Sequence, residues 1–85
     1  KIPPGTDVLI THGPPSGILD YTQAGEYAGC RELLAAVGEI APRVHIFGHI
    51  HEGRGIEKRD GTTFINASSI SANYRQLYPP FVIEV

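Results

Sequence analysis

The chain has 85 residues, 41% of them hydrophobic and 19% charged, with seven Lys plus Arg against nine Asp plus Glu and a formal charge of −2. This composition is typical of one small globular unit, and the absence of a basic run gives no electrostatic surface for duplex nucleic acid or an anionic membrane. No apolar run is long enough to span a membrane, no signal peptide is apparent, and the single cysteine cannot form an internal disulfide. We therefore expect an intracellular, cytoplasmic protein.

The first predicted element is a short strand, Asp7–Thr11, whose apolar centre predicts cover on both of its faces. His12 follows at the end of this strand and precedes a glycine and two prolines, which fix a turn. Proteins of the α/β class usually carry their ligand-binding groups at such strand ends. The pattern alone leaves a second interpretation open, in which His12 merely caps the strand.

A helix is predicted next, after an irregular stretch at 20–29. Apolar residues recur at helical spacing from Cys30 to Ala41, and Pro42 ends the helix. The strand Val44–Phe47 follows. Strand, helix and strand in this order indicate two parallel neighbours with their carboxyl ends at one edge of the sheet, which would bring the histidines that follow the two strands within reach of each other.

The histidine pair His49 and His51 lies in a glycine-rich loop directly after the second strand. Alternate residues of an extended chain project to the same side, so both imidazoles can face one small volume. His45 also alternates with them, but it lies inside the apolar run, where a hydrogen-bonded core histidine is the expected role. A hairpin, 55–59 and 62–66, is predicted around the turn Asp60-Gly61, and a last strand at 81–85.

Several classes of metal and catalytic site are excluded by spacing. The two histidines are not four residues apart on a helix as in zinc proteases, there is no Cys-x-x-Cys of a zinc finger, and neither a Gly-x-Ser-x-Gly elbow nor a phosphate-binding P-loop occurs. Two features indicate missing partners. Apolar strands need cover that one helix cannot give, and neutral imidazoles cannot compensate the charge of two divalent cations. We therefore expect a second half to complete the domain.

Two sequence blocks carry a family resemblance. Gly48-His49-Ile50-His51 resembles the last signature block of the calcineurin-like metallophosphoesterases, and Thr11-His12-Gly13 resembles the block before it. The wider stretches 7–15, 46–53 and 64–68 are similar to the metallophosphoesterase-domain-containing branch, which is cytosolic and has cyclic-nucleotide phosphodiesterase activity. The similarity covers nearly the whole chain.

This resemblance implies that 1–85 is the C-terminal half of a four-layer α/β/β/α sandwich, active only with its N-terminal half as partner. The family's earlier blocks, Asp-x-His, Gly-Asp-x-x-Asp and Gly-Asn-His-Asp/Glu, do not occur here. By resemblance, His12 and His49 would bind one divalent ion and His51 another, with Mn, Fe or Zn as the candidates. A hydroxide held by the two metals would attack a phosphodiester, such as a cyclic nucleotide, in line.

Two further residues are candidates for substrate binding. Gly13 could offer its backbone N–H to a phosphate oxygen, and Arg54 could contact phosphate or a nucleotide, although an arginine between glycines is often simply solvated. Two other functions remain open at the level of sequence. One is a non-catalytic module of the same fold that binds a partner, and the other is a domain in which the three histidines hold a single zinc ion. Either way, we expect no turnover by the 85-residue chain alone.

Overall fold

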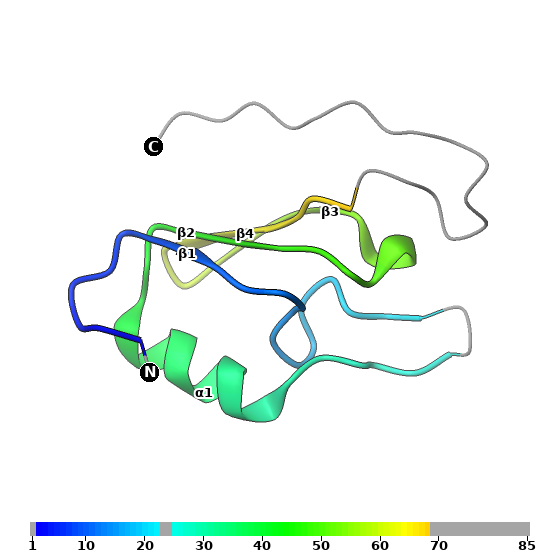
Figure 1. Ribbon diagram of the computed structural model, residues 1–85, viewed down its shortest axis with the longest axis horizontal. Coiled ribbons are helices and arrows are strands. Elements are labelled where there is room, and N and C mark those ends of the chain that lie inside the picture. Colours follow the sequence, from blue (N-terminus) through cyan, green and yellow to red (C-terminus); the bar gives the residue numbers. More distant parts are fainter. Residues whose placement is uncertain (1, 23–24, 69–85) are drawn as a thin grey trace.

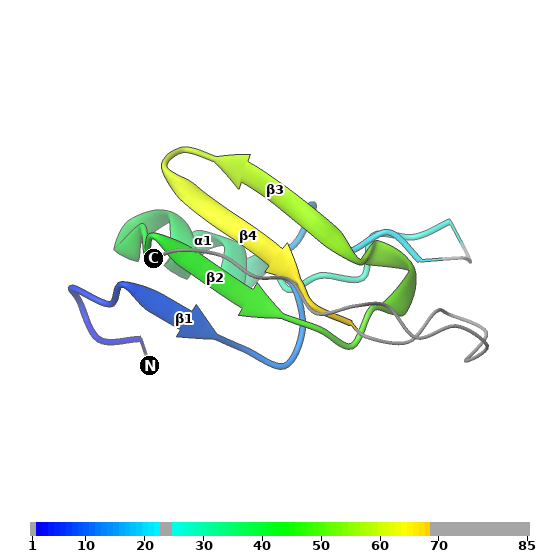
Figure 2. The same ribbon diagram turned by 90° about the horizontal axis from the view of Figure 1, so that it is seen from above.

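The computed structural model describes residues 2–22 and 25–68, which form one sheet with a helix on it. The elements in chain order are β1 (Val8–Ile10), α1 (Arg31–Ile40), β2 (Val44–Phe47), a short 3-10 helix (His51–Gly53), β3 (Gly55–Arg59) and β4 (Thr62–Asn66). The strand order is β1-β2-β4-β3. Strands β1, β2 and β4 run parallel, and β3 pairs antiparallel with β4 (Figure 2). The predicted mixed α/β class is confirmed.

Helix α1 lies along one face of the sheet (Figure 1). Cys30 caps its start, with the sulfur accepting the N–H of Leu33 at 3.4 Å. At its end Ala41 adopts a left-handed φ of 51° and donates its N–H to the carbonyl of Val37 at 2.7 Å. Pro42 follows and cannot continue the helix. The predicted helix is therefore confirmed, with Ala41 acting as its cap.

The hydrophobic core fills the space between α1 and the sheet. Its buried members are Ile18, Val37, Phe47 and Phe64, and Leu9, Leu19 and Leu33 pack against them. Ile18 comes from the loop before the helix and is 0% exposed. That loop therefore belongs to the core and holds the chain beside the sheet edge where the predicted site lies.

The opposite face of the sheet is partly open. Side chains alternate between the two faces of a strand, so Val8 and Ile10 lie opposite Leu9 in β1. They are 43% and 72% exposed, and Ile56 in β3 is 47% exposed. Among the described residues α1 covers one face of β1, so the cover that the sequence predicts for the other face stays a prediction.

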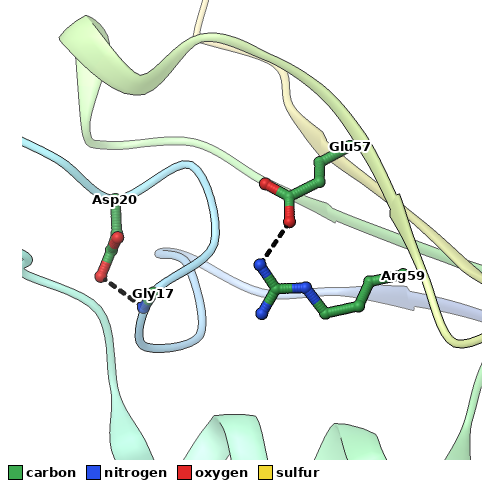
Figure 3. A network of polar contacts seen from close by, with 4 residues as sticks. All are labelled: Gly17, Asp20, Glu57 and Arg59. Atoms are coloured by element: carbon green, nitrogen blue, oxygen red, sulfur yellow. Dashed lines mark hydrogen bonds and ion pairs between the residues drawn. The ribbon is translucent and has the colours of Figure 1, made fainter.

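The hairpin β3–β4 has the bounds that the sequence predicts. Its turn residues Asp60 and Gly61 both have positive φ, 51° and 83°, which is the geometry that a two-residue hairpin turn requires. Arg59 and Glu57 form an ion pair at 2.6 Å along β3 (Figure 3). The sequence did not indicate that β4 would pair in parallel with β2, and this pairing places the end of β4 at the edge that carries the histidines.

A buried carboxylate organises the loop between β1 and α1. Asp20 is 1% exposed, and its Oδ2 accepts the backbone N–H of Gly17 at 2.8 Å (Figure 3). The same oxygen also accepts the backbone N–H of Gly29 at 2.9 Å. A Cβ on Gly29 would lie 2.3 Å from the carbonyl oxygen of Pro15, so this close approach requires glycine. Apart from residues 23–24, which are not described, the stretch 20–29 contains no helix and only an isolated bridge, as predicted.

One predicted element cannot be compared with the fold. The last predicted strand, 81–85, lies outside the described residues. Within the described ranges, no helix combines the length and apolar character that crossing a membrane requires.

Candidate metal centre at the carboxyl edge of the sheet

The carboxyl ends of the three parallel strands meet at one edge of the sheet (Figure 2). Backbone hydrogen bonds continue beyond the strands themselves. The N–H of Gly48 donates to the carbonyl of His12 at 3.1 Å, and the N–H of Ala67 donates to the carbonyl of Phe47 at 2.8 Å. The segments that follow β1, β2 and β4 are therefore held side by side, as the strand-helix-strand pattern predicts for the first two.

His12 and His49 come together at this edge. Both side chains are exposed, and their ring centroids lie 4.5 Å apart with an angle of 38° between the ring planes. Two nitrogen ligands of one ion lie within about 4 Å of each other, because each metal–nitrogen bond is about 2 Å long. The pair of rings is close enough to meet this condition. It thus fits two of the ligands that a transition-metal site needs.

The backbone at His49 adopts an unusual conformation. Its φ is 71°, and the N–H of Ile50 donates to the carbonyl of Gly48 at 2.8 Å. These two features define a γ-turn of the rarer and strained form, with positive φ at the central residue. Such strain persists only where the surrounding structure over-determines it, and it is concentrated at functional sites. The loop therefore holds the His49 imidazole in a position that an ordinary strand ending would not give.

His51 begins the 3-10 helix that follows, and its side chain lies outside the described part of the structure. The prediction that it binds a metal stays a prediction. Among the described residues, no group of three or more His, Cys, Asp or Glu side chains is arranged to hold a metal ion. The described residues therefore fit as part of a metal-ligand set and need further ligands to complete it.

The two aspartates that flank β1 in the chain, Asp7 and Asp20, have different surroundings. Oδ2 of Asp20 accepts two backbone N–H groups within its own loop. Asp7 precedes β1 at the opposite edge of the sheet, where its carbonyl accepts the N–H groups of Arg43 and Val44. Asp7 thus lies at the end of the sheet away from His12 and His49, whereas Oδ1 of Asp20 is buried without a hydrogen-bond partner.

Asn66 ends β4 at the same edge and is 0% exposed. Its amide nitrogen donates to the carbonyl oxygens of Ile50, at 2.8 Å, and Leu19, at 3.1 Å. Its amide oxygen accepts from the N–H and the hydroxyl of Ser68 at 3.2 and 2.8 Å. Asn66 lies in the family-like stretch 64–68, but the sequence indicated no role for it in the site. The signal that could have found it is a polar side chain at the end of an apolar strand, the position that also carries His12 and His49.

His45 is a core histidine, as expected. It is 0% exposed and its ring lies against Phe47 and Phe64. Thr11 Oγ1 uses its one proton to donate to the carbonyl of Gly13 at 2.8 Å, so in the 3.0 Å contact between Thr11 Oγ1 and His45 Nε2 the imidazole is the donor. Burial lowers the pKa of His45 from 6.5 to about 4. This side chain is therefore neutral at physiological pH and helps to fix the segment that leads to His12.

The two candidate substrate-binding residues each follow a candidate metal ligand in the chain, Gly13 after His12 and Arg54 after His51. There is open space around Gly13, where an added Cβ would meet nothing within 4 Å. Arg54 is half-buried and lines a shallow hollow together with Tyr21, Tyr27 and Glu52. These surroundings leave room for a ligand near each residue, and their contact with substrate stays a prediction.

Several known proteins resemble this chain in sequence. The chain is 49% identical over 86 residues to the human metallophosphoesterase domain-containing protein 1, and the aligned part is 99% of this chain and 26% of that protein. It is 46% identical over 84 residues to a UPF0046 protein of Caenorhabditis elegans, with 99% and 29% covered. These similarities suggest the metallophosphoesterase superfamily. The chain thus spans about a quarter of the length of these relatives.

Two other results show that the names of similar proteins do not by themselves assign an activity to this chain. No family model matches the chain. A shorter stretch is 48% identical over 59 residues to a probable rhamnogalacturonate lyase C of Emericella nidulans, which is 67% of this chain and 5% of that protein. That name describes a different chemistry from the name of the human relative. The geometry of the site therefore bears more directly on the activity of this chain.

Proposed function

We propose that this chain supplies part of the metal site of a metal-dependent phosphodiesterase of the metallophosphoesterase type. The observation that carries the proposal is the pairing of His12 and His49, whose rings lie 4.5 Å apart at the ends of two adjacent parallel strands. Two exposed imidazoles from separate loops, one of them on a strained γ-turn, are a costly arrangement for a surface without a ligand. The expected substrates are small phosphodiesters, cyclic nucleotides among them.

Two divalent ions, Mn, Fe or Zn, would supply water activation and neutralise charge on the phosphate. The residues of this chain would hold and orient the site. His12 and His49 would share one ion and His51 would bind the second. The N–H of Gly13 and the guanidinium of Arg54 would contact phosphate oxygens.

The remaining ligands, carboxylates included, would come from sequence outside this chain, in an N-terminal half of the same domain. This division agrees with the position of Asp7 at the opposite edge of the sheet and with the two N–H groups that Oδ2 of Asp20 accepts. It also agrees with the exposed apolar face of β1, which a second sheet would cover. The complete domain would be cytoplasmic and would bind neither duplex nucleic acid nor membranes.

The proposal is tested in the complete protein that contains this chain, with a chromogenic aryl phosphodiester as substrate. We expect His12→Ala and His49→Ala each to lower metal-dependent hydrolysis by at least about 100-fold, because each removes a ligand of the reacting centre. His51→Ala should do the same. Lys58→Ala, an exposed change on β3, is the matched control and should leave turnover unchanged.

Unchanged hydrolysis in His12→Ala and His49→Ala would refute the proposal. If the parent protein hydrolyses no diester with Mn, Fe or Zn, the chain belongs to a non-catalytic module that binds a partner. Metal content of the parent provides the second readout. Two ions per molecule are expected, and one zinc ion bound by the three histidines would contradict the dimetal site.

A further inference from the structure

We propose that Asn66 is a positioning residue for the loop that carries His49 and His51. Strand β4 would hold this loop through the side chain of Asn66. The consequence for metal binding rests on the proposed function. Asn66 would touch neither substrate nor metal. It would act through the carbonyl of Ile50, which lies in the chain between the two histidines.

The amide of Asn66 joins three segments at one point. Its nitrogen carries two N–H groups, and both donate hydrogen bonds. One donates to the carbonyl of Ile50 in the histidine loop at 2.8 Å, and the other donates to the carbonyl of Leu19 in the loop before α1 at 3.1 Å. The donor is 0% exposed. A hydrogen bond away from water restrains its partners more strongly than a solvated one, and its loss leaves buried polar groups without partners.

The orientation of this amide is fixed from its other side. The N–H and hydroxyl of Ser68 both point at Oδ1 of Asn66, at 3.2 and 2.8 Å. These donors can be satisfied only if the oxygen faces Ser68 and the nitrogen faces the two carbonyls. The side chain therefore has one satisfied orientation, in which it binds the histidine loop.

Close contact around Asn66 leaves the loop little room to shift. The carbonyl of Ile50 also accepts the N–H of Gly53 at 3.0 Å. A Cβ on Gly53 would lie 2.2 Å from the carbonyl oxygen of Leu19 and 3.0 Å from Nδ2 of Asn66. The 3-10 turn after His51 is thus packed directly onto the Asn66 amide, and this packing over-determines the strained γ-turn at His49.

The test uses Asn66→Asp and Asn66→Ser in the complete protein. Asp keeps the shape and the acceptor for Ser68, but it presents an oxygen to the two carbonyls in place of the N–H donors. Ser is neutral and also lacks both donors. We expect the Mn²⁺ dissociation constant to rise roughly 10–100-fold in each variant, the range typical of outer-shell partners of metal ligands. In the metal-free protein, amide hydrogen exchange of residues 49–53 should accelerate.

Thr62→Val is the matched control. Thr62 is also buried in β4, and its hydroxyl donates to the carbonyl of Pro42 at 2.6 Å, at the opposite end of the strand. Its loss removes a buried hydrogen bond of similar kind but leaves the histidine loop untouched. We expect Thr62→Val to lower the melting temperature while the Mn²⁺ dissociation constant and the exchange of 49–53 stay at parent values.

Three outcomes would overturn the inference. The first is an unchanged Mn²⁺ dissociation constant and unchanged amide exchange of residues 49–53 in both Asn66 variants, and the second is a change of the same size in Thr62→Val. The third is failure of both Asn66 variants to fold where Thr62→Val folds. The last result would make Asn66 a general core residue. His49→Ala separates this inference from the proposed function. If His49→Ala retains Mn²⁺ binding and hydrolysis, the metal site is refuted, whereas the exchange of 49–53 still decides what Asn66 does to the loop.

Discussion

Burial of one histidine makes the stability of this fold sensitive to acid. The folded state holds His45 with a pKa of about 4, against 6.5 for an unburied histidine. Between these values the unfolded chain takes up a proton that the folded chain does not, so folding weakens as the pH falls from 6.5 towards 4. The contribution of His45 to the free energy of unfolding is fully present above pH 6.5 and is lost by pH 4. At about 1.4 kcal/mol per pKa unit, this loss is about 3 kcal/mol.

His45→Gln tests this dependence. Glutamine can donate a proton from a position near that of Nε2 but does not titrate, so the unfolding free energy of the variant should fall less between pH 7 and pH 4 than that of the parent. Chemical unfolding of metal-free protein at several pH values measures the difference. Equal pH dependence of parent and variant would mean that His45 is not the responsible group.

Sequence reasoning at the scale of single residues succeeds where the position depends on local chain order. His12 and His49 each follow a strand, and the strand-helix-strand pattern is enough to place them at one edge. Asn66 could not be assigned in this way. Its role depends on β4 pairing with β2, a non-local choice that neither the hairpin nor the apolar pattern specifies.

At the scale of elements, the loop from 48 to 53 depends on glycine for its contact with the rest of the fold. Gly53 has no space for a side chain against the carbonyl of Leu19. Gly53→Ala should therefore push the 3-10 turn away from β4 and lower metal-dependent hydrolysis by at least about 10-fold, because small displacements of ligands are costly to catalysis. Kinetics of the complete protein at saturating metal and substrate measures the effect.

Gly38→Ala is the control for this substitution. Gly38 lies inside α1, where an added Cβ meets nothing within 4 Å, and alanine should stabilise the helix by about 1 kcal/mol. Its hydrolysis should equal that of the parent. Full activity in Gly53→Ala would show that the turn can move without disturbing the histidines.

The bounds of elements could be predicted best where turn chemistry is explicit. Asp60-Gly61 defines the hairpin, and Pro42 defines the end of α1. The conformation at His49 could not be predicted, because a non-glycine residue with a φ of 71° is imposed by its surroundings and has no signature in its own sequence.

At the scale of the whole molecule, two deficits of this chain would be explained together by the proposed second half of the domain. The face of the sheet opposite α1 exposes Ile10, Val8 and Ile56, and in the described ranges no group of three or more His, Cys, Asp or Glu side chains is arranged to hold a metal ion. A second half of the domain that packs on this face and brings carboxylates to the edge would remove both deficits. Oδ2 of Asp20 already accepts the N–H groups of Gly17 and Gly29.

The isolated 85-residue chain should therefore lack metal-dependent phosphodiesterase turnover, whereas the longer protein that contains it should be active. The exposed apolar face should also bind a fluorescent hydrophobic dye in the isolated chain, and the signal should fall in the longer protein because that face is then covered. Ile10→Lys gives an internal control: on the isolated chain it should reduce dye binding, and in the longer protein it should disrupt folding, because it places a charge in the new interface. Turnover by the isolated chain with Mn²⁺ would refute the split site, since all ligands would then have to come from residues 1–85.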